Sequence, residues 1–208
     1  MSVVVGANIL VVCTGNICRS PLAERLLLAR LDAAGIDRGQ VSVGSAGTRA
    51  VVGHAMTEQA AAELAGVGGD PQGHLARQLT PELVRDADLV VTATLAHRRE
   101  VVTLYPEALR RSFTLLELAR LLDDADLSLL DGPPAERVRG FGAVVARRRR
   151  SPVATEPNAD DVVDPFGQSL AVYSATTGQI APAVEALVRA IGEPHVAARL
   201  GGRGPCER

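Results

Sequence analysis

One short loop carries most of the residues whose types and spacing could do chemistry. It reads Cys13-Thr14-Gly15-Asn16-Ile17-Cys18-Arg19-Ser20 and follows the apolar run Asn8–Val12, which predicts a buried strand. The segment Ser20–Ala34 predicts a helix that ends at Gly35. A loop between a strand and a helix can turn its backbone N–H groups toward an anion, and the helix adds the positive end of its dipole. The loop therefore predicts a phosphate-type anion site.

Two side chains of this loop predict what would happen to a bound phosphate. Cys13 lies at the loop entrance, where the same positive field favours the nucleophilic thiolate over the thiol. Arg19 offers a planar fork to two phosphate oxygens. A lone cysteine at the end of a buried strand is usually only a small core residue. Here the Gly, Asn, Arg and Ser around it fall where an anion cradle needs them. We therefore expect phosphoryl chemistry on Cys13.

Length and composition limit the fold and exclude several classes of function. The 208 residues, 47 % of them hydrophobic, suit one α/β domain. A net charge of −2 gives no reason to expect a nucleic-acid partner, and no apolar run is long enough to span a membrane. The chain has no lysine, so it lacks the Gly-Lys-Ser/Thr of a nucleotide-binding loop. Three cysteines and an N-terminus without a basic region predict a reducing, cytoplasmic setting.

Strand and helix patterns alternate along the chain. The predicted strands are Asn8–Val12, Gln40–Ser45, Ala87–Ala93 and Ser112–Leu115. The predicted helices are Ser20–Ala34, Thr57–Ala65, Thr80–Arg85, His97–Leu104, Ala135–Arg150 and Leu170–Ile191, with a possible break at Pro182. This alternation predicts a parallel sheet with helices on both faces, and catalytic groups at the carboxyl ends of its strands.

The later part of the chain is less regular. A Pro-rich, acidic loop is predicted over Ser151–Asp161, and a disordered tail over residues 192–208 follows the single domain of residues 1–191. The run Arg147–Arg150 is typical of a solvated helix end, and a docking surface for an acidic partner is the alternative interpretation.

Several segments, in order along the chain, resemble the low-molecular-weight protein tyrosine phosphatase family of bacterial type. After the loop at Cys13, the family's second-strand segment is similar to Gly44-Ser45-Ala46-Gly47-Thr48, and its His-x-Ala/Ser-Arg segment to His74-Leu75-Ala76-Arg77. Asp88-Leu89-Val90 with His97-Arg98 fits its third strand and following helix, and Asp164-Pro165-Phe166-Gly167 resembles its Asp-Pro loop. The matches span residues 8–173. The resemblance implies a three-layer α/β sandwich, the flavodoxin-like phosphatase I fold, around a four-stranded parallel sheet.

The resemblance also implies a role for each matched residue. Cys13 would take the phosphoryl group, Arg19 would hold its oxygens, and Asp164 would protonate the leaving group and then activate water. The implied phosphate-binding and supporting positions are Thr14, Gly15, Asn16, Ile17, Cys18, Ser20, Ser45 and His74. Without the resemblance, His74 reads as an ordinary surface histidine. No cofactor is implied, and scattered His and Cys residues give no metal-ligand set.

The substrate is less clearly indicated than the chemistry. Aromatic residues make up only 2 % of the chain, so the pocket walls are expected from Ile17, Val51 and Phe166. The leading interpretation is a protein-tyrosine phosphatase that acts on a phosphorylated protein, with a bacterial tyrosine kinase as its counterpart. A protein-arginine phosphatase of the same family is the alternative, although Ile17 suits a phenyl ring better than a guanidinium. A thiol-dependent arsenate reductase using Cys13 and Cys18, and a non-catalytic phosphate-binding module, are weaker alternatives.

Cys13 and Cys18 share one loop, which also predicts redox sensitivity. Peroxide oxidises a thiolate to a sulfenic acid, and Cys18 could then capture it as a disulfide. The alternative is that Cys18 only packs under the loop.

Overall fold

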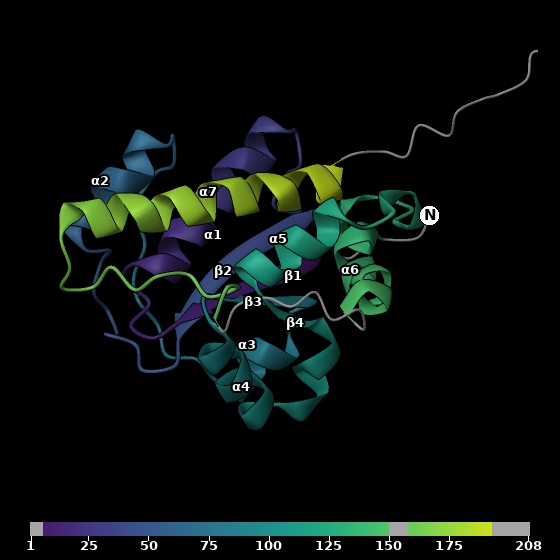
Figure 1. Ribbon diagram of the computed structural model, residues 1–208, viewed down its shortest axis with the longest axis horizontal. Helices are drawn as coiled ribbons and strands as arrows, with labels where there is room; N and C mark the ends of the chain where they lie inside the picture. The colour runs from purple at the N-terminus through teal and green to yellow at the C-terminus, as the bar shows by residue number, and fades with distance from the viewer. Residues whose placement is uncertain (1–5, 150–157, 193–208) are drawn as a thin grey trace, which may run out of the picture.

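A four-stranded parallel sheet forms the centre of the structure, a computed structural model that describes residues 6–149 and 158–192 (Figure 1). Its strands are β1 (Ala7–Cys13), β2 (Val41–Gly47), β3 (Leu89–Thr92) and β4 (Ser112–Thr114). They lie in the order β2-β1-β3-β4, and every neighbouring pair is parallel. The connections leave β1 toward β2 and later return to its other side at β3. Ligands of such sheets bind at the carboxyl ends of the strands at this switch, where β1 ends in Cys13.

Helices cover both faces of the sheet. One face carries α1 (Arg19–Ala33), α5 (Leu115–Asp123) and α7 (Leu170–Gly192), with α2 (Glu58–Gly66) and α6 (Pro134–Arg149) at the two ends of that layer (Figure 1). The other face carries α3 (Pro81–Arg85) and α4 (Leu95–Leu104). Two short 3-10 helices are η1 (Pro106–Arg111) and η2 (Leu127–Leu129). The predicted three-layer α/β sandwich is confirmed.

Alternating side chains of β1 supply both hydrophobic cores. Ile9, Val11 and Cys13 belong to the larger core under α1, α5 and α7, whereas Leu10 and Val12 belong to the smaller core on the α3 and α4 side. Because both faces of this strand are buried, it reads as a continuous apolar run in the sequence. The sulfur of Cys13 therefore lies on the side of the sheet from which α1 starts.

Threonine caps begin four of the helices and fix where the loops end. The side chains of Thr57, Thr80, Thr94 and Thr114 each accept the backbone N–H three residues on. Thr114 forms a full capping box with Glu117. This capping box starts α5, a helix that the sequence analysis missed because it assigned Leu115 to the fourth strand.

The expectation of a break at Pro182 is wrong, and other expectations fall on residues outside the described part of the chain. Pro182 does not break α7, which runs unbroken past it; the residue four positions earlier is Gly178, and buried residues flank the proline on both sides. Residues 151–157 of the predicted loop, Arg150 and the predicted tail from residue 193 onward lie outside the described residues. The side chains of the Arg147–Arg150 run are outside them as well.

Candidate active site

The loop between β1 and α1 turns its carbonyl oxygens away from its own interior. The segment that follows β2 donates backbone N–H groups to the carbonyl oxygens of Cys13, Thr14 and Gly15, at 2.9 to 3.0 Å. On the other side of the loop, the N–H of Thr57 binds the carbonyl of Ile17 at 2.9 Å. Since the carbonyls are engaged outward, the N–H groups of the loop are left for an anion inside it. Hydrogen bonds from neighbouring segments thus hold the loop in the shape that the predicted anion site requires.

Asn16 holds the tightest bend of this loop. Its φ of 56° lies in the left-handed region, which asparagine tolerates better than most residues. The side chain is fully buried, and its Oδ1 accepts the backbone N–H of Arg77 at 2.9 Å. Its carbonyl accepts Nε2–H of His74 at 2.8 Å, so that imidazole nitrogen carries a proton. His74 is only 7 % exposed, so the alternative interpretation as an ordinary surface histidine is wrong.

A chain of hydrogen bonds leads from Asn16 to the sulfur of Cys13. The amide nitrogen of Asn16 donates to Ser20 Oγ at 2.8 Å and to Ser45 Oγ at 2.7 Å. Ser45 in turn donates to the Glu24 carboxylate. Because Ser20 Oγ already accepts from the amide, its own hydrogen is free to point at the Cys13 sulfur, 3.0 Å away. The geometry therefore allows Ser20 to donate a hydrogen bond to the sulfur of Cys13.

Arg19 and Asp164 meet across the mouth of the loop. The Arg19 guanidinium is 6 % exposed, and one terminal nitrogen lies 2.6 Å from an Asp164 oxygen. The other terminal nitrogen lies 3.4 Å from the carbonyl of Val162. Within the described part of the chain, the buried Nε–H of Arg19 has no hydrogen-bond partner. A buried donor without a partner is costly, and an anion in the cradle would satisfy it.

Only one of three neighbouring aspartates reaches this mouth. Asp160 pairs with Arg120 of α5 at 2.7 Å. Asp161 accepts the backbone N–H of Leu95, the first residue of α4, at 2.7 Å, which places a carboxylate at the positive end of that helix. Asp164 is left half exposed beside Arg19, in the position where a proton donor can meet a substrate.

These groups line a cavity of about 210 Å³. Its lining residues are Cys13, Thr14, Gly15, Ile17, Cys18, Arg19, Arg49, Val51, Asp164 and Phe166. The predicted walls Ile17, Val51 and Phe166 are therefore brought to the same pocket as the predicted nucleophile and acid. Arg49 was not predicted as a site residue; it lies at the rim, 72 % exposed, with Glu100 3.9 Å away.

His97 is a second residue that the sequence analysis missed, having used it only as a marker of the helix after the third strand. It is 5 % exposed, and its Nε2 lies 2.8 Å from Thr14 Oγ1 while its Nδ1 lies 2.7 Å from Thr94 Oγ1. Burial, with help from the positive charges of Arg19 and Arg49 and against Asp164, lowers its pKa from 6.5 to about 4. His97 is therefore neutral near pH 7.

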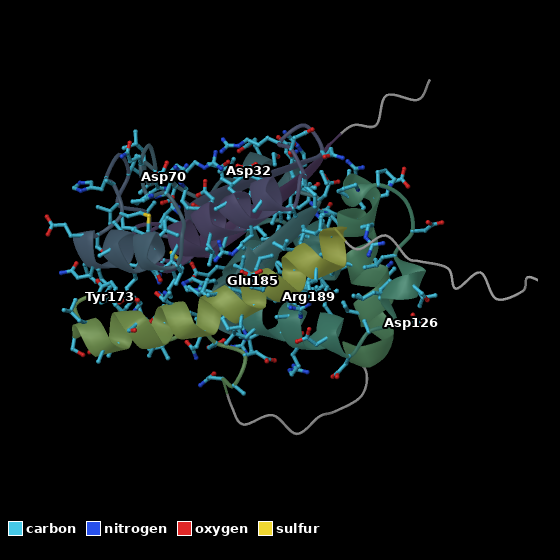
Figure 2. All side chains as sticks on the ribbon, turned by 90° about the horizontal axis from the view of Figure 1, so that it is seen from above. Asp32, Asp70, Asp126, Tyr173, Glu185 and Arg189 are labelled. Atoms are coloured by element: carbon cyan, nitrogen blue, oxygen red, sulfur yellow. The ribbon has the colours of Figure 1, made fainter. Side chains whose placement is uncertain are left out.

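Cys18 lines the cavity, and its polar partners come from the start of α2 and from α7. Its sulfur lies 3.4 Å from Thr57 Oγ1 and 3.9 Å from the hydroxyl of Tyr173, which is labelled near the start of α7 in Figure 2. Burial raises the pKa of the Cys18 thiol. Cys13 and Cys18 are both free thiols in this structure.

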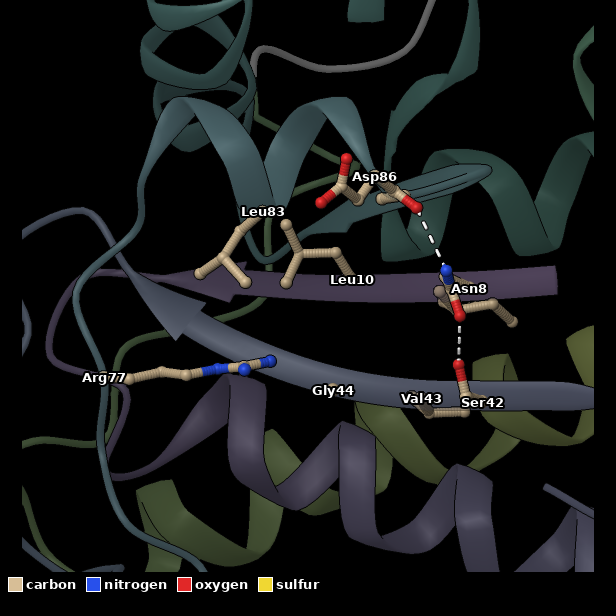
Figure 3. Close-up of a pocket in the computed structure, with 10 residues that line it drawn as sticks. Asn8, Leu10, Ser42, Val43, Gly44, Arg77, Leu83 and Asp86 are labelled. Atoms are coloured by element: carbon tan, nitrogen blue, oxygen red, sulfur yellow. Dashed lines mark hydrogen bonds between the residues drawn. The ribbon is translucent and has the colours of Figure 1, made fainter. Parts of the chain in front are cut away.

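A second hollow of about 220 Å³ lies on the other side of β2, between β1, β2 and α3 (Figure 3). The Arg77 side chain reaches across Gly44 there and donates from Nε to the Ser45 carbonyl at 2.7 Å. A Cβ at Gly44 would lie 2.5 Å from a terminal nitrogen of Arg77, so any larger residue there would displace the end of the Arg77 side chain. Arg77 thus supports Asn16 and Ser45 from behind the loop.

The described residues lack two features that would point to other functions. No cluster of three or more His, Cys, Asp or Glu side chains there could hold a metal ion. None of the helices in residues 6–149 and 158–192 combines the length and the hydropathy that a membrane span requires.

Comparison with known proteins decides the family. The family model described as low molecular weight phosphotyrosine protein phosphatase matches residues 8–150, more than half of the chain. The chain belongs to this family. The phosphatase Etp of Escherichia coli (strain K12) is 43 % identical over 100 residues, which cover 48 % of this chain and 63 % of Etp. The matched part is therefore a little under two thirds of that relative. Ptp of Acinetobacter johnsonii is 35 % identical over 108 residues, 52 % of this chain and 71 % of Ptp.

Solved phosphatase structures of the family share the fold. The tyrosine phosphatase AmsI of Erwinia amylovora superposes with a TM-score of 0.64 at 26 % identity, covering 89 % of this chain and 93 % of that one. The YwlE arginine phosphatase of Geobacillus stearothermophilus gives a TM-score of 0.62 at 27 % identity, covering 88 % and 91 %. Tyrosine and arginine phosphatases thus both occur among the structural relatives of this chain.

Proposed function

We propose that the protein hydrolyses phosphotyrosine in proteins through a phosphocysteine intermediate. The observation that carries the proposal is the joint geometry of one pocket: Cys13 at the cradle, Arg19 with a buried Nε–H that lacks a partner, and Asp164 at the mouth. A passive phosphate-binding module would need the cradle and the arginine, but it would have no use for a sulfur held by Ser20 or for an acid at the mouth.

In the first step, the Cys13 thiolate attacks the phosphorus and the bond from phosphorus to the phenolic oxygen breaks. The loop N–H groups and Arg19 hold the equatorial oxygens as charge shifts onto them. Asp164 gives its proton to the departing oxygen, so tyrosine leaves as a neutral phenol. For this step the ion pair between Arg19 and Asp164 opens as the arginine turns to the phosphate, and Asp164 takes from solvent the proton that it gives to the leaving oxygen.

In the second step, water hydrolyses the phosphocysteine. Asp164, now a carboxylate, takes a proton from a water molecule whose oxygen attacks the phosphorus. The sulfur–phosphorus bond breaks, and Cys13 returns as a thiolate that accepts the Ser20 hydrogen bond. Inorganic phosphate is released, and no cofactor takes part.

The pocket walls favour an aryl phosphate. Ile17 and Val51 lie beside the cradle and Phe166 lies at its mouth, so a phenyl ring meets apolar side chains. A phosphoarginine would place a guanidinium against the same apolar surface, where Asp164 is the one carboxylate among the described lining residues. Phosphoarginine remains the second candidate because YwlE arginine phosphatase is among the structural relatives.

The test compares the two substrates directly. Purified enzyme is assayed with one peptide carrying phosphotyrosine and the same peptide carrying phosphoarginine, with arsenate reduction as a third assay. We expect phosphotyrosine to be preferred and Ile17→Thr to shift the ratio toward phosphoarginine. Preference for phosphoarginine by the wild type would replace the first candidate by the second, and thiol-dependent arsenate reduction alone would overturn both.

The nucleophile is tested separately with Cys13→Ser. This variant should bind inorganic phosphate and show no turnover, since an alcohol in this cradle is a far weaker nucleophile than a thiolate. Appreciable hydrolysis of an aryl phosphate by Cys13→Ser would refute the assignment.

The wider setting follows from the same chemistry. A thiolate nucleophile beside a second free thiol requires a reducing compartment, so we assign the enzyme to the cytoplasm. Its substrate would be a phosphorylated protein, with a tyrosine kinase as the opposing activity. Oxidation of Cys13 and its capture by Cys18 would switch the enzyme off reversibly.

A further inference from the structure

The turn that joins β3 to α4 contacts both loops that carry the reacting groups. We call the loop at residues 13–20, which carries Cys13, the phosphate loop, and the segment of residues 160–167, which carries Asp164, the acid loop. Toward the phosphate loop, His97 Nε2 lies 2.8 Å from Thr14 Oγ1. Toward the acid loop, the N–H of Leu95 binds Asp161 Oδ1 at 2.7 Å, and the carbonyl of Ala93 accepts the N–H of Val162 at 2.8 Å. All of these contacts come from residues 93–97, which are the turn and the first three residues of α4.

The contact to the phosphate loop is rigid. The imidazole of His97 is 5 % exposed, its second nitrogen binds the Thr94 side chain at 2.7 Å, and its backbone N–H binds the same hydroxyl at 3.3 Å. The charged groups that face it are Arg19, Arg49 and Asp164. Both ring nitrogens are thus engaged, and the ring has one available orientation from which to hold Thr14.

The contact to the acid loop matters most when substrate is bound. In the empty site, Asp164 is held by Arg19 at 2.6 Å. A phosphate in the cradle competes for the same guanidinium, because its oxygens match the fork that the carboxylate occupies. The acid loop must then be held by its other contacts, and Asp161 at the start of α4 lies only three residues before Asp164.

We propose that the turn between β3 and α4 sets the spacing between the phosphate loop and the acid loop, with His97 and Asp161 as its positioning residues. The proposal rests on the proposed phosphatase function. His97 acts on the cradle, and through it on anion binding and on the reactivity of Cys13. Asp161 acts on the placement of Asp164, and through it on proton transfer alone.

The experiment separates these two actions with matched variants. His97→Leu and Thr14→Val each remove the same hydrogen bond, while His97→Gln keeps a polar amide, which can donate or accept, in place of the imidazole. Asp161→Ala removes the contact to Leu95, while Asp161→Asn keeps the accepting oxygen. Thr103→Val, on an exposed part of α4, controls for general effects on that helix. Thermal unfolding checks that each variant is folded.

Three measurements are made on every variant: binding of inorganic phosphate, the rate of Cys13 alkylation by iodoacetate, and kcat for aryl phosphates with good and poor leaving groups. His97→Leu and Thr14→Val should each weaken phosphate binding about tenfold, the size of one lost hydrogen bond, and should slow alkylation. His97→Gln should restore most of the phosphate binding. The double variant should bind no more weakly than either single one, because both remove one bond.

Asp161→Ala should leave phosphate binding and alkylation unchanged. It should lower kcat for the poor leaving group by about tenfold or more and for the good one far less, since only proton transfer is disturbed. Equal losses for both leaving groups, or no rescue by Asp161→Asn, would overturn the role of Asp161. Additive losses in the double variant would overturn that of His97. Phosphate binding and alkylation need no turnover, so the His97 result stands apart from any failure of the proposed function.

Discussion

Substitutions at Asn16 should show how much its buried hydrogen bonds and its backbone conformation each contribute to the free energy of unfolding. The asparagine makes three side-chain hydrogen bonds, to Ser45 Oγ at 2.7 Å, to Ser20 Oγ at 2.8 Å and from the Arg77 N–H at 2.9 Å. At about 1 kcal/mol for each bond, their loss costs about 3 kcal/mol. Alanine at φ 56° adds about 1 kcal/mol of strain. Asn16→Ala should therefore lose about 4 kcal/mol of unfolding free energy.

Two matched variants test each part of this sum. Glycine adopts the left-handed region without strain, so Asn16→Gly should be about 1 kcal/mol more stable than Asn16→Ala. Asn158 also has a positive φ, 67°, but it is exposed in a turn. Asn158→Ala should therefore cost about 1 kcal/mol or less, since only the backbone term applies.

The assay is urea unfolding at neutral pH, with the m-value checked for each variant, and kcat/KM for an aryl phosphate on the same samples. Activity of both Asn16 variants should fall, because Ser20 is no longer oriented toward Cys13. A cost for Asn16→Ala that equals the cost for Asn158→Ala would show that the buried network contributes nothing, and would refute the reasoning.

Three further results are expected. Asp164→Asn should slow a poor, high-pKa leaving group by roughly 10² or more and a good one far less; equal slowing would mean that Asp164 is structural. After a peroxide pulse, dithiothreitol should restore the wild type but not Cys18→Ser, whereas equal recovery would leave Cys18 with a packing role only. The pKa of His97 is lowered from 6.5 to about 4, so the unfolded chain binds a proton in that window that the native state does not. Stability should therefore fall as pH drops from about 6.5 to 4, by about 3 kcal/mol more in the wild type than in His97→Gln, measured by urea unfolding at each pH; parallel pH profiles would contradict this.

Local patterns were sufficient to predict the sheet, most helices and the anion loop. The apolar run of β1, the Gly after α1 and the threonine before α2 are signals that act within a few residues of where they stand. The capping box at Thr114 and Glu117 was an equally local signal, and it could have revealed α5. The break predicted at Pro182 is absent because the packing of α7 on both sides of the proline outweighs the loss of one helical hydrogen bond.

The sequence by itself placed the candidate nucleophile beside the candidate phosphate-binding arginine, because Cys13, Arg19 and the helix that follows them form one continuous segment. Local patterns could not show how the loop is held, because Ser45, His74 and Arg77, which bind Asn16, are all distant in the chain. The family resemblance named Ser45 and His74 as supporting positions, but it did not name Arg77. Only the tertiary structure decided that His97 reaches Thr14, across 83 positions, since that contact depends on the packing of α4 against the sheet and leaves no local pattern.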